Sequence, residues 1–392
     1  MPLPPLNSDI TIADLTHDPY GFYRVARAHT PVVRVAAVGR TMLTKAADTR
    51  HAKENWETYS SDDPNTPMKR AFQAHTLMRK DGAAHKRERN AMMASFSQRN
   101  IRDVWIPIYS RVVDEYIGRL PRGEVVDLFP ALAGPVAARC LSHLIGLEHA
   151  SDGDLCRWSQ TLIDGAGNFG WQDELFAATD SANGEINACI QQTVDAHGTN
   201  DTPHAINAML DLDEPMDIDV IRSNIKIVIG GGINEPRDAL LTAIYGVLTN
   251  PDQHADVMTD PSLWMSVFEE SVRWVAPIQV SSRRLNEDVQ IRGLDIPKGD
   301  VVMTIQASAN HDEDLYENGH LFDIHRPKQA HQAFGNGPHF CLGTHIARRT
   351  VADLLLPTLF DRFPNMELVP EAPAIFSGFG FRGPITLPVR LN

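Results

Sequence analysis

The sequence predicts a mainly helical protein with small β-sheets, an α+β fold, in a single domain that spans residues 1–392. Two observations carry this prediction. Apolar residues recur at three- and four-residue spacing over long segments, whereas alternating β-branched runs are few and short. The chain also has no internal repeat and no Gly/Ser linker that would divide it.

Residues 130–147 and 345–360 carry apolar residues at helical spacing, and each predicts a helix. The longest predicted helix runs from Ile221 to Leu248. Three consecutive glycines and Pro236 stand at its midpoint, and both residue types disfavour a helix interior. Because proline has no N–H for the carbonyl of Gly232, four residues before it, we expect this helix to open there.

Three segments predict strands. Residues 32–45 indicate an early hairpin, and residues 283–310 combine β-branched alternation with Arg-Gly and Lys-Gly turns. A last strand pair is expected around residues 366–390. These segments are short, so the predicted sheets are small.

The composition of the chain disfavours several classes of function. The net charge of −14 disfavours broad binding to nucleic acid or to a membrane surface. The four cysteines show no CxxC spacing, which argues against a disulfide framework or a zinc site. No signal peptide and no run of 18 apolar residues is evident. We therefore expect a soluble cytoplasmic enzyme.

The stretch FGNGPHFCLG, residues 334–343, places Cys341 inside a glycine-rich loop just before a predicted helix. Glycines allow sharp turns, and the N–H groups at a helix start favour a thiolate. Such a sulfur suits a nucleophile or an axial metal ligand, and Gly343 would let the helix pass close to a flat cofactor. A buried structural cysteine is the plainer alternative.

The pattern F-x-x-G-x-x-x-C-x-G in this loop closely resembles the cytochrome P-450 superfamily of haem-thiolate monooxygenases, and the resemblance extends from about residue 10 to the C-terminus. It implies the cytochrome P-450 fold, with haem b between the long distal helix and the cysteine loop. Cys341 would then be the iron ligand, whose electron density favours O–O cleavage. The loop residues that would contact the haem are Phe334, Gly335, His339 and Gly343.

Two further spacings match this family. His85 and Arg89 lie four apart, as in the family's propionate-binding H-x-x-x-R motif, and Arg283 matches another propionate-contacting arginine. Taken alone, His85 and Arg89 would be an exposed basic helix face. Glu270 and Arg273 match the family's E-x-x-R, whose third member would be Arg326.

On that resemblance these three form a buried structural ion cluster, although alone Glu270 and Arg273 would be an ordinary solvated pair.

The long helix departs from the family pattern. The family carries an acid and a threonine over the distal haem face, whereas this chain has Asn234 and Glu235 after Gly232. We expect Glu235, with Asn234 and Gly232 beside it, to replace the usual relay as proton donor or water organiser. Simple sequence drift is the alternative.

This Asn-Glu-Pro variation resembles two bacterial groups. One is the aromatic O-demethylases, which the segment GFGFRGP at 378–384 also resembles, and the other is the haem domains fused to a flavin and iron–sulfur reductase. The expected reaction is therefore dioxygen-dependent oxidation of a small apolar, aromatic substrate, with O-demethylation of a methoxyaromatic as the specific form. The residues expected to line its pocket are Phe72, Phe169, Ile229, Ile233, Ile278, Val280 and Phe379.

Three alternatives stay open. The enzyme could be a hydroxylase, an S-oxidase or a peroxide-driven oxidase of another substrate, such as a fatty acid or a terpenoid, or the protein could be a non-catalytic haem sensor. Electrons are expected from a separate ferredoxin or flavin/iron–sulfur reductase, or from a fused reductase outside this chain. The basic residues that could dock such a partner, or form a solvated face, are Arg79, Lys80, Arg87, Arg348 and Arg349.

Overall fold

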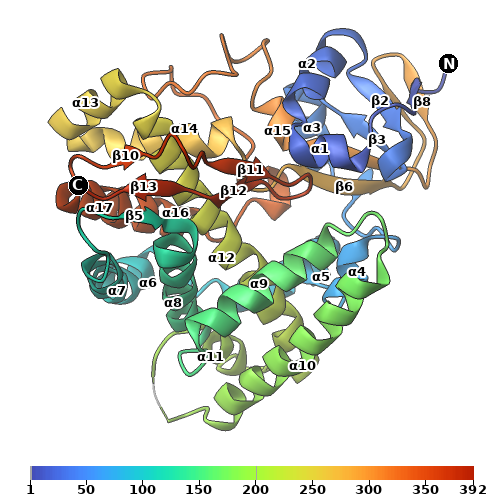
Figure 1. The fold of residues 1–392 in the computed structure, drawn as a ribbon. Coiled ribbons are helices and arrows are strands. Elements are labelled where there is room, and N and C mark those ends of the chain that lie inside the picture. Colours follow the sequence, from blue (N-terminus) through green and yellow to red (C-terminus); the bar gives the residue numbers. More distant parts are fainter. Residues whose placement is uncertain (1, 200) are drawn as a thin grey trace.

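Helices make up most of the computed structural model, which describes residues 2–199 and 201–392 (Figure 1). The predicted mainly helical fold is therefore confirmed. The α-helices are α1 (Ile12–His17), α2 (Tyr20–His29), α3 (Ala46–Glu54), α4 (Pro67–Ala71), α5 (Gly82–Met92), α6 (Gln98–Asn100), α7 (Ile106–Gly118), α8 (Gly134–Ile145), α9 (Asp152–Ala166), α10 (Asp173–Asp195), α11 (Ala205–Leu210), α12 (Ile218–Leu248), α13 (Pro251–Thr259), α14 (Trp264–Trp274), α15 (Gln306–Ala309), α16 (Thr344–Arg348) and α17 (Leu356–Arg362).

Shorter or wider helical turns join several of these helices. The turns are η1 (Ala36–Val38), η2 (Leu77–Arg79), η3 (Ile101–Trp105), η4 (Phe129–Ala133), η5 (Pro261–Leu263), η6 (Gly337–His339) and η7 (Arg349–Leu355). The segment expected to be helical at 345–360 is a continuous run of α16, η7 and α17.

The largest sheet joins the N-terminal region to strands from residues 280–305. Its strand order is β1-β2-β3-β9-β6-β4, and the central pair β3 and β9 is parallel, with Thr41 opposite Val302. The strands are β1 (Leu6–Asn7), β2 (Val32–Val35), β3 (Arg40–Leu43), β4 (Tyr59–Ser60), β5 (Val125–Asp127), β6 (Val280–Leu285), β7 (Val289–Ile291), β8 (Leu294–Ile296), β9 (Val301–Ile305), β10 (Glu367–Leu368), β11 (Ile375–Ser377), β12 (Gly383–Thr386) and β13 (Pro388–Arg390).

The predicted strand segments are present, with one difference at the C-terminal end. β2 pairs with β3, β6 pairs with β9, and β7 pairs with β8, all antiparallel. The final region forms two pairs where one was expected, because β10 pairs with β13 while β11 pairs with β12. β13 also pairs with β5, so this sheet ties the C-terminus to the start of α8.

α12 crosses the middle of the molecule and packs against α8, α9 and α14 (Figure 1). No break occurs at Gly232, because the helix continues through the three glycines and Pro236, although Pro236 has no N–H to donate to the Gly232 carbonyl. Packing explains the glycine better: a Cβ atom on Gly232 would lie 2.7 Å from Leu141 Cδ1, so the absence of a side chain lets α8 and α12 approach closely.

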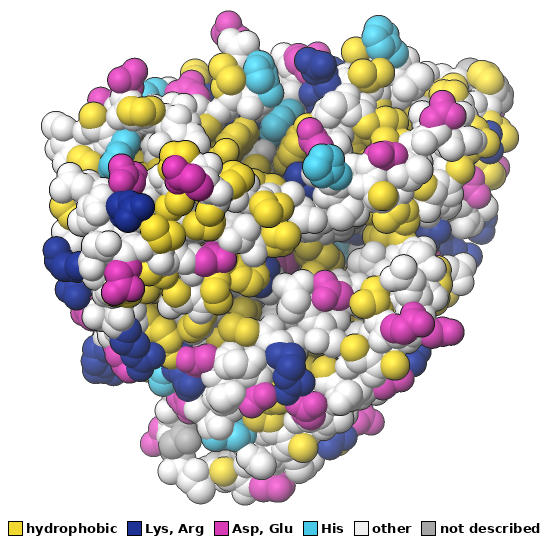
Figure 2. Space-filling view, in the orientation of Figure 1, with side chains coloured by type: hydrophobic (Ala, Val, Ile, Leu, Met, Phe, Trp, Pro, Cys, Tyr) yellow, Lys and Arg dark blue, Asp and Glu magenta, His cyan; other side chains and the backbone are white. Residues whose placement is uncertain are grey.

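Most buried apolar residues form one large cluster that extends from Met68 to Leu391, and two smaller clusters lie under the large sheet. On the face drawn in Figure 2, acidic and basic side chains are interspersed, and no large basic block is visible there. Within residues 2–199 and 201–392, none of the helices combines the length and the apolar character that crossing a membrane requires.

Candidate functional site

The cysteine loop is held by backbone geometry and two hydrogen bonds. Gly335 and Gly337 have φ values of 74° and 64°, in the left-handed region that side chains disfavour. The N–H of Cys341 donates to the carbonyl of Phe334 at 2.9 Å, and the hydroxyl of Thr344 donates to the Cys341 carbonyl at 2.8 Å. The loop therefore turns back on itself and fixes the cysteine immediately before α16.

A cavity separates this loop from α12. Cys341 is accessible, and the surface it exposes faces this cavity. The α12 residues on the opposite wall recur in pairs four residues apart, as one face of a helix does. They are Ile227, Val228, Gly231, Gly232, Glu235, Pro236, Ala239 and Leu240. The sulfur thus lies across the cavity from the part of α12 that departs from the family pattern.

The thiol faces the inside of the protein, so desolvation decides its protonation when only the protein surrounds it. Desolvation raises the pKa of the Cys341 thiol, and the lowering effects of the Gly343 N–H and the Thr344 hydroxyl are each smaller. The expected thiolate-favouring helix start is therefore outweighed by desolvation, and α16 is only five residues long. A bound metal ion changes this balance, because a coordinated thiol is deprotonated.

One end of the cavity is lined by basic side chains. The four residues expected to bind propionates, His85, Arg89, Arg283 and His339, all lie there. The rings of His85 and His339 stand 4.2 Å apart, and His339 Nε2 lies 3.0 Å from Ser61 Oγ.

Arg89 reaches from α5 to the cysteine loop, where its Nη2 donates to the Phe340 carbonyl at 2.7 Å. Lys53 and Arg79, which the sequence did not single out as site residues, line the same end.

The electrostatics of this end indicate an anionic ligand. Burial lowers the pKa of Arg283 to about 10 and, with His339 and Arg89 nearby, lowers that of His85 to about 4. Among the described residues, Nε of Arg79 and Nε of Arg283 are buried with no hydrogen-bond partner. Haem carries two propionates at one edge, so the cations at one end and Cys341 on one wall fit this cofactor.

Glu235 is the ionisable group on the α12 wall of the cavity. Its two carboxyl oxygens are buried, and neither has a hydrogen-bond partner in the described parts of the chain. Burial raises its pKa to about 8, with a smaller raising effect from Asp238. The carboxyl is therefore protonated at neutral pH and can donate a proton toward the cavity.

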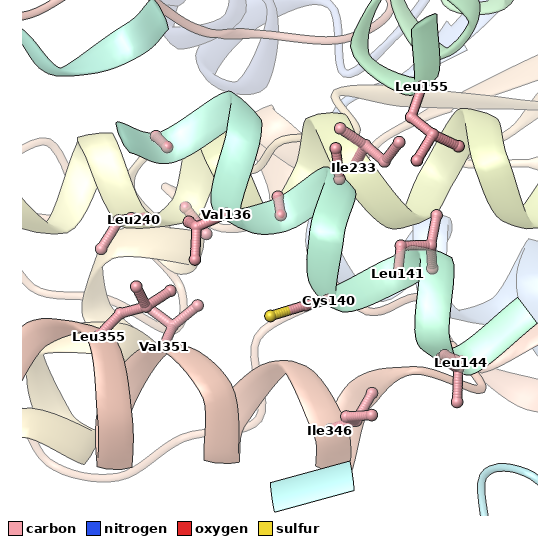
Figure 3. Packing of buried hydrophobic residues seen from close by; sticks show 14 of the residues in the cluster. Val136, Cys140, Leu141, Leu144, Leu155, Ile233, Leu240, Ile346, Val351 and Leu355 are labelled. Carbon is pink, nitrogen blue, oxygen red and sulfur yellow. The ribbon is translucent and has the colours of Figure 1, made fainter. Parts of the chain in front are cut away.

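Five predicted site residues do not reach the cavity. Asn234, Ile229 and Ile233 lie on other faces of α12 and are buried away from the wall. Figure 3 shows Ile233 beside Leu155 of α9.

Phe72 and Phe379 are equally buried in the core, and Phe379 packs against Phe169 with ring centroids 5.7 Å apart. For the three residues of α12 the cause is that this helix is buried on nearly all sides, so apolar character does not identify its cavity face.

Phe169, Ile278 and Val280 do line the cavity, as expected, together with Gly232 and the loop residues Phe334, Gly335 and Gly343. The sequence reasoning missed Phe381, which also lines it and forms a β-bridge with Ile278. Phe379 and Phe381 belong to the same GFGFRGP segment. The β-bridge between Phe381 and Ile278 places Phe381, and not Phe379, on the cavity wall. The local sequence does not reveal this contact.

Of the five basic residues considered for docking a redox partner, Arg79 lies on the cavity wall. Three of the remaining basic residues form ion pairs, Lys80 with Glu88, Arg348 with Glu269 and Arg349 with Asp353.

Arg87 is exposed on α5. The docking role of these residues stays a prediction.

Glu270 lies between two guanidinium groups, as the family resemblance implied. Arg273 Nε and Nη2 donate to its two carboxylate oxygens, each at 2.6 Å, and Arg326 Nε lies 3.5 Å from Oε1. Oε1 also accepts from the N–H of Asp323 at 2.9 Å. All of these partners fix the segment that leads to the cysteine loop, so the cluster is structural in position.

We expect Glu270→Gln to lower the free energy of unfolding by about 3–5 kcal/mol, because it leaves the buried Arg273 without its counter-charge. Denaturant unfolding of the purified protein measures this loss. The control is Glu115→Gln, which removes an exposed i,i+4 pair with Arg119 and should cost less than about 1 kcal/mol. Equal effects of the two substitutions would contradict a stabilising role of Glu270.

Comparisons with known proteins agree with this site. A family model described as "Cytochrome P450" matches residues 168–374, more than half of the chain. The chain is 27% identical over 329 residues to 6-deoxyerythronolide B hydroxylase of Saccharopolyspora erythraea, which covers 82% of this chain and 80% of the relative. It is 27% identical over 381 residues to a steroid C26-monooxygenase of Mycobacterium tuberculosis, covering 93% and 92%.

Solved structures give the same fold. The cytochrome P450 CxnD, described as an enzyme for C–S bond formation in chuangxinmycin biosynthesis, aligns with a TM-score of 0.87 at 23% identity over 98% of each chain. CalO2 aligns with a TM-score of 0.84 at 25% identity over 96% of each chain. The cofactor is thus haem b, and the chain belongs to the cytochrome P450 family of monooxygenases.

Proposed function

We propose that residues 1–392 form one haem-thiolate monooxygenase domain that oxidises a small, uncharged aromatic substrate, by O-demethylation when the substrate is a methoxyaromatic. The observation that carries this proposal is the division of the cavity. Charged groups gather at one end, whereas the walls near α9 and α12 are apolar, with Phe169 and Phe381 among them. An apolar chamber with aromatic walls favours a neutral aromatic ring.

The chain's own residues have separate roles in this proposal. Cys341 would ligate the iron, and His85, Arg89, Arg283 and His339 would hold the propionates. The haem, when bound, supplies dioxygen activation and insertion of one oxygen atom into the substrate.

Glu235 would donate a proton from the α12 wall, since its carboxyl is protonated at neutral pH and lies where the family carries its relay.

The substrate chemistry balances. A methoxyaromatic, dioxygen, two electrons and two protons give a hemiacetal and water, and the hemiacetal releases formaldehyde to leave a phenol. The electrons would come from a separate ferredoxin or flavin/iron–sulfur reductase, or from a fused reductase. The same carboxyl of Glu235 could move a proton between the two oxygens of hydrogen peroxide, which makes peroxide-driven oxidation the companion route.

Hydroxylation of a larger alicyclic substrate is the second candidate. It is supported by the names of two relatives, which describe a hydroxylase of 6-deoxyerythronolide B and a steroid C26-monooxygenase. The apolar walls suit such substrates too, so the discriminating feature is the size of the molecule that the chamber accepts.

We expect methoxyphenols to shift the Soret band of the ferric protein toward the high-spin position, because a bound substrate changes the ligation of the iron. Titration with these compounds, and with fatty acids, terpenoids and steroids, measures the preference. Formaldehyde release with a reductant supply would then support demethylation. A shift with steroids or terpenoids but not with methoxyaromatics would replace the first candidate with the second.

A further inference from the structure

A buried lysine lies at the basic end of the cavity. Lys53, near the C-terminal end of α3, has 2% of its surface exposed, and it lines the cavity together with Arg79 and Arg283. It was absent from the residues that resemble the family's propionate-binding pattern. A cation buried this deeply needs a counter-charge, because desolvation of an unpaired ammonium is costly.

The contacts of Lys53 within the chain are neutral. The side-chain amide of Gln306 is satisfied only with its oxygen toward Ser281 and Lys53, and in that orientation Lys53 Nζ donates to this oxygen at 3.0 Å. An ammonium group has three donors, and Lys53 borders the cavity. The contact with Gln306 therefore orients the side chain without neutralising it.

Acidic groups around this end are already engaged. Asp81 bonds to His339 at 3.3 Å, to the hydroxyl of Ser60 at 2.7 Å and to the N–H of Ser61 at 2.8 Å. In the described parts of the chain, no carboxylate contacts Lys53 or Arg283. The basic end therefore carries more positive charge than the protein neutralises.

The backbone fixes Lys53 relative to the cysteine loop. A Cβ atom on Gly337 would lie 2.6 Å from the Lys53 carbonyl oxygen, so only glycine permits this contact between α3 and η6. The backbone of Lys53 is thus packed directly against the loop that carries Cys341, although the two residues lie far apart in the sequence.

We propose that Lys53 is a further positioning residue for the cofactor, and that its ammonium group binds a haem propionate beside Arg283. Arg79, with its unpartnered Nε, lies in the same cluster and can share that propionate. The proposal depends on haem as the cofactor and not on the identity of the substrate.

The test is Lys53→Met in the holoenzyme, with two measurements that do not involve turnover. Transfer of haem to excess apomyoglobin should become about ten- to a hundredfold faster, the range expected for loss of one charge-assisted hydrogen bond. The midpoint potential of the bound haem should become more negative, because the reduced haem carries one more negative charge and loses a nearby cation.

Lys226→Met is the matched control, since Lys226 is also buried, at 3% exposed, but lies off the cavity wall on α12. It should change neither measurement, and Lys53→Arg should restore both toward the wild-type values. If Lys53→Met does not fold, the neutral Lys53→Gln variant provides the same comparison. A haem-transfer rate and a midpoint potential that match those of the wild type in the neutral variant would overturn the proposal.

Discussion

Replacing Cys341 with alanine is expected to abolish substrate oxidation and to remove the long-wavelength Soret band of a thiolate-bound ferrous carbonyl haem. The reason is electronic, because a thiolate ligand increases electron density on iron and favours O–O cleavage. Absorption spectra of the reduced, carbon monoxide-treated protein and product formation measure the two effects.

Cys140 offers the control, since it also lines the cavity but belongs to α8. Figure 3 shows it pointing from α8 toward the helix that carries Ile346, Val351 and Leu355. Cys140→Ala should keep the spectrum and the activity. If Cys140→Ala lost the thiolate spectrum and Cys341→Ala retained it, the assignment of the ligand would be wrong.

Replacing Glu235 with glutamine is expected to lower coupled product formation by about 10²–10⁴-fold, the usual contribution of a general acid. The amide has nearly the same size but cannot donate the proton of a carboxylic acid. Haem and substrate binding should persist, so the loss appears as less product per electron consumed. Glu174→Gln, on the exposed first turn of α10, is the control and should leave coupling unchanged.

The pH dependence of the wild type tests the same role. Because burial raises the pKa of Glu235 to about 8, the carboxyl holds its proton below that pH and loses it above. Coupling should therefore fall as the pH rises through about 8, and Glu235→Gln should show no such fall. Unchanged coupling in Glu235→Ala or Glu235→Gln would rule out the proposed acid.

The parts of the site that the sequence predicted share a property: each is encoded by a local spacing. The cysteine loop, His85 with Arg89 and Glu270 with Arg273 lie within one loop or one helix, so a short pattern carries their geometry.

Glu235 was identified in the same way, because it stands at the helix position where the family pattern has a threonine. The helix ends and the hairpins followed from the same kind of local information.

What the sequence could not predict depends on long-range packing. Lys53 and Arg79 reach the cavity only because α3 packs against β9 and η6, and η2 packs against α5 and α12, and no neighbouring residue in the sequence signals this. On α12 the apolar residues Ile229 and Ile233 looked suitable for a substrate wall, although both faces of this helix are buried. The glycines and Glu235 were the better guide to its cavity face.

The parallel pairing of β3 with β9 also sets an order of events during synthesis. Thr41 cannot pair with Val302 until Val302 has been synthesised. The large sheet therefore stays incomplete until about two-thirds of the chain has followed β3 from the ribosome. At ordinary elongation rates this interval is on the order of tens of seconds. Cys341 emerges later still, so the nascent chain is expected to gain its affinity for haem only after the large sheet is able to close.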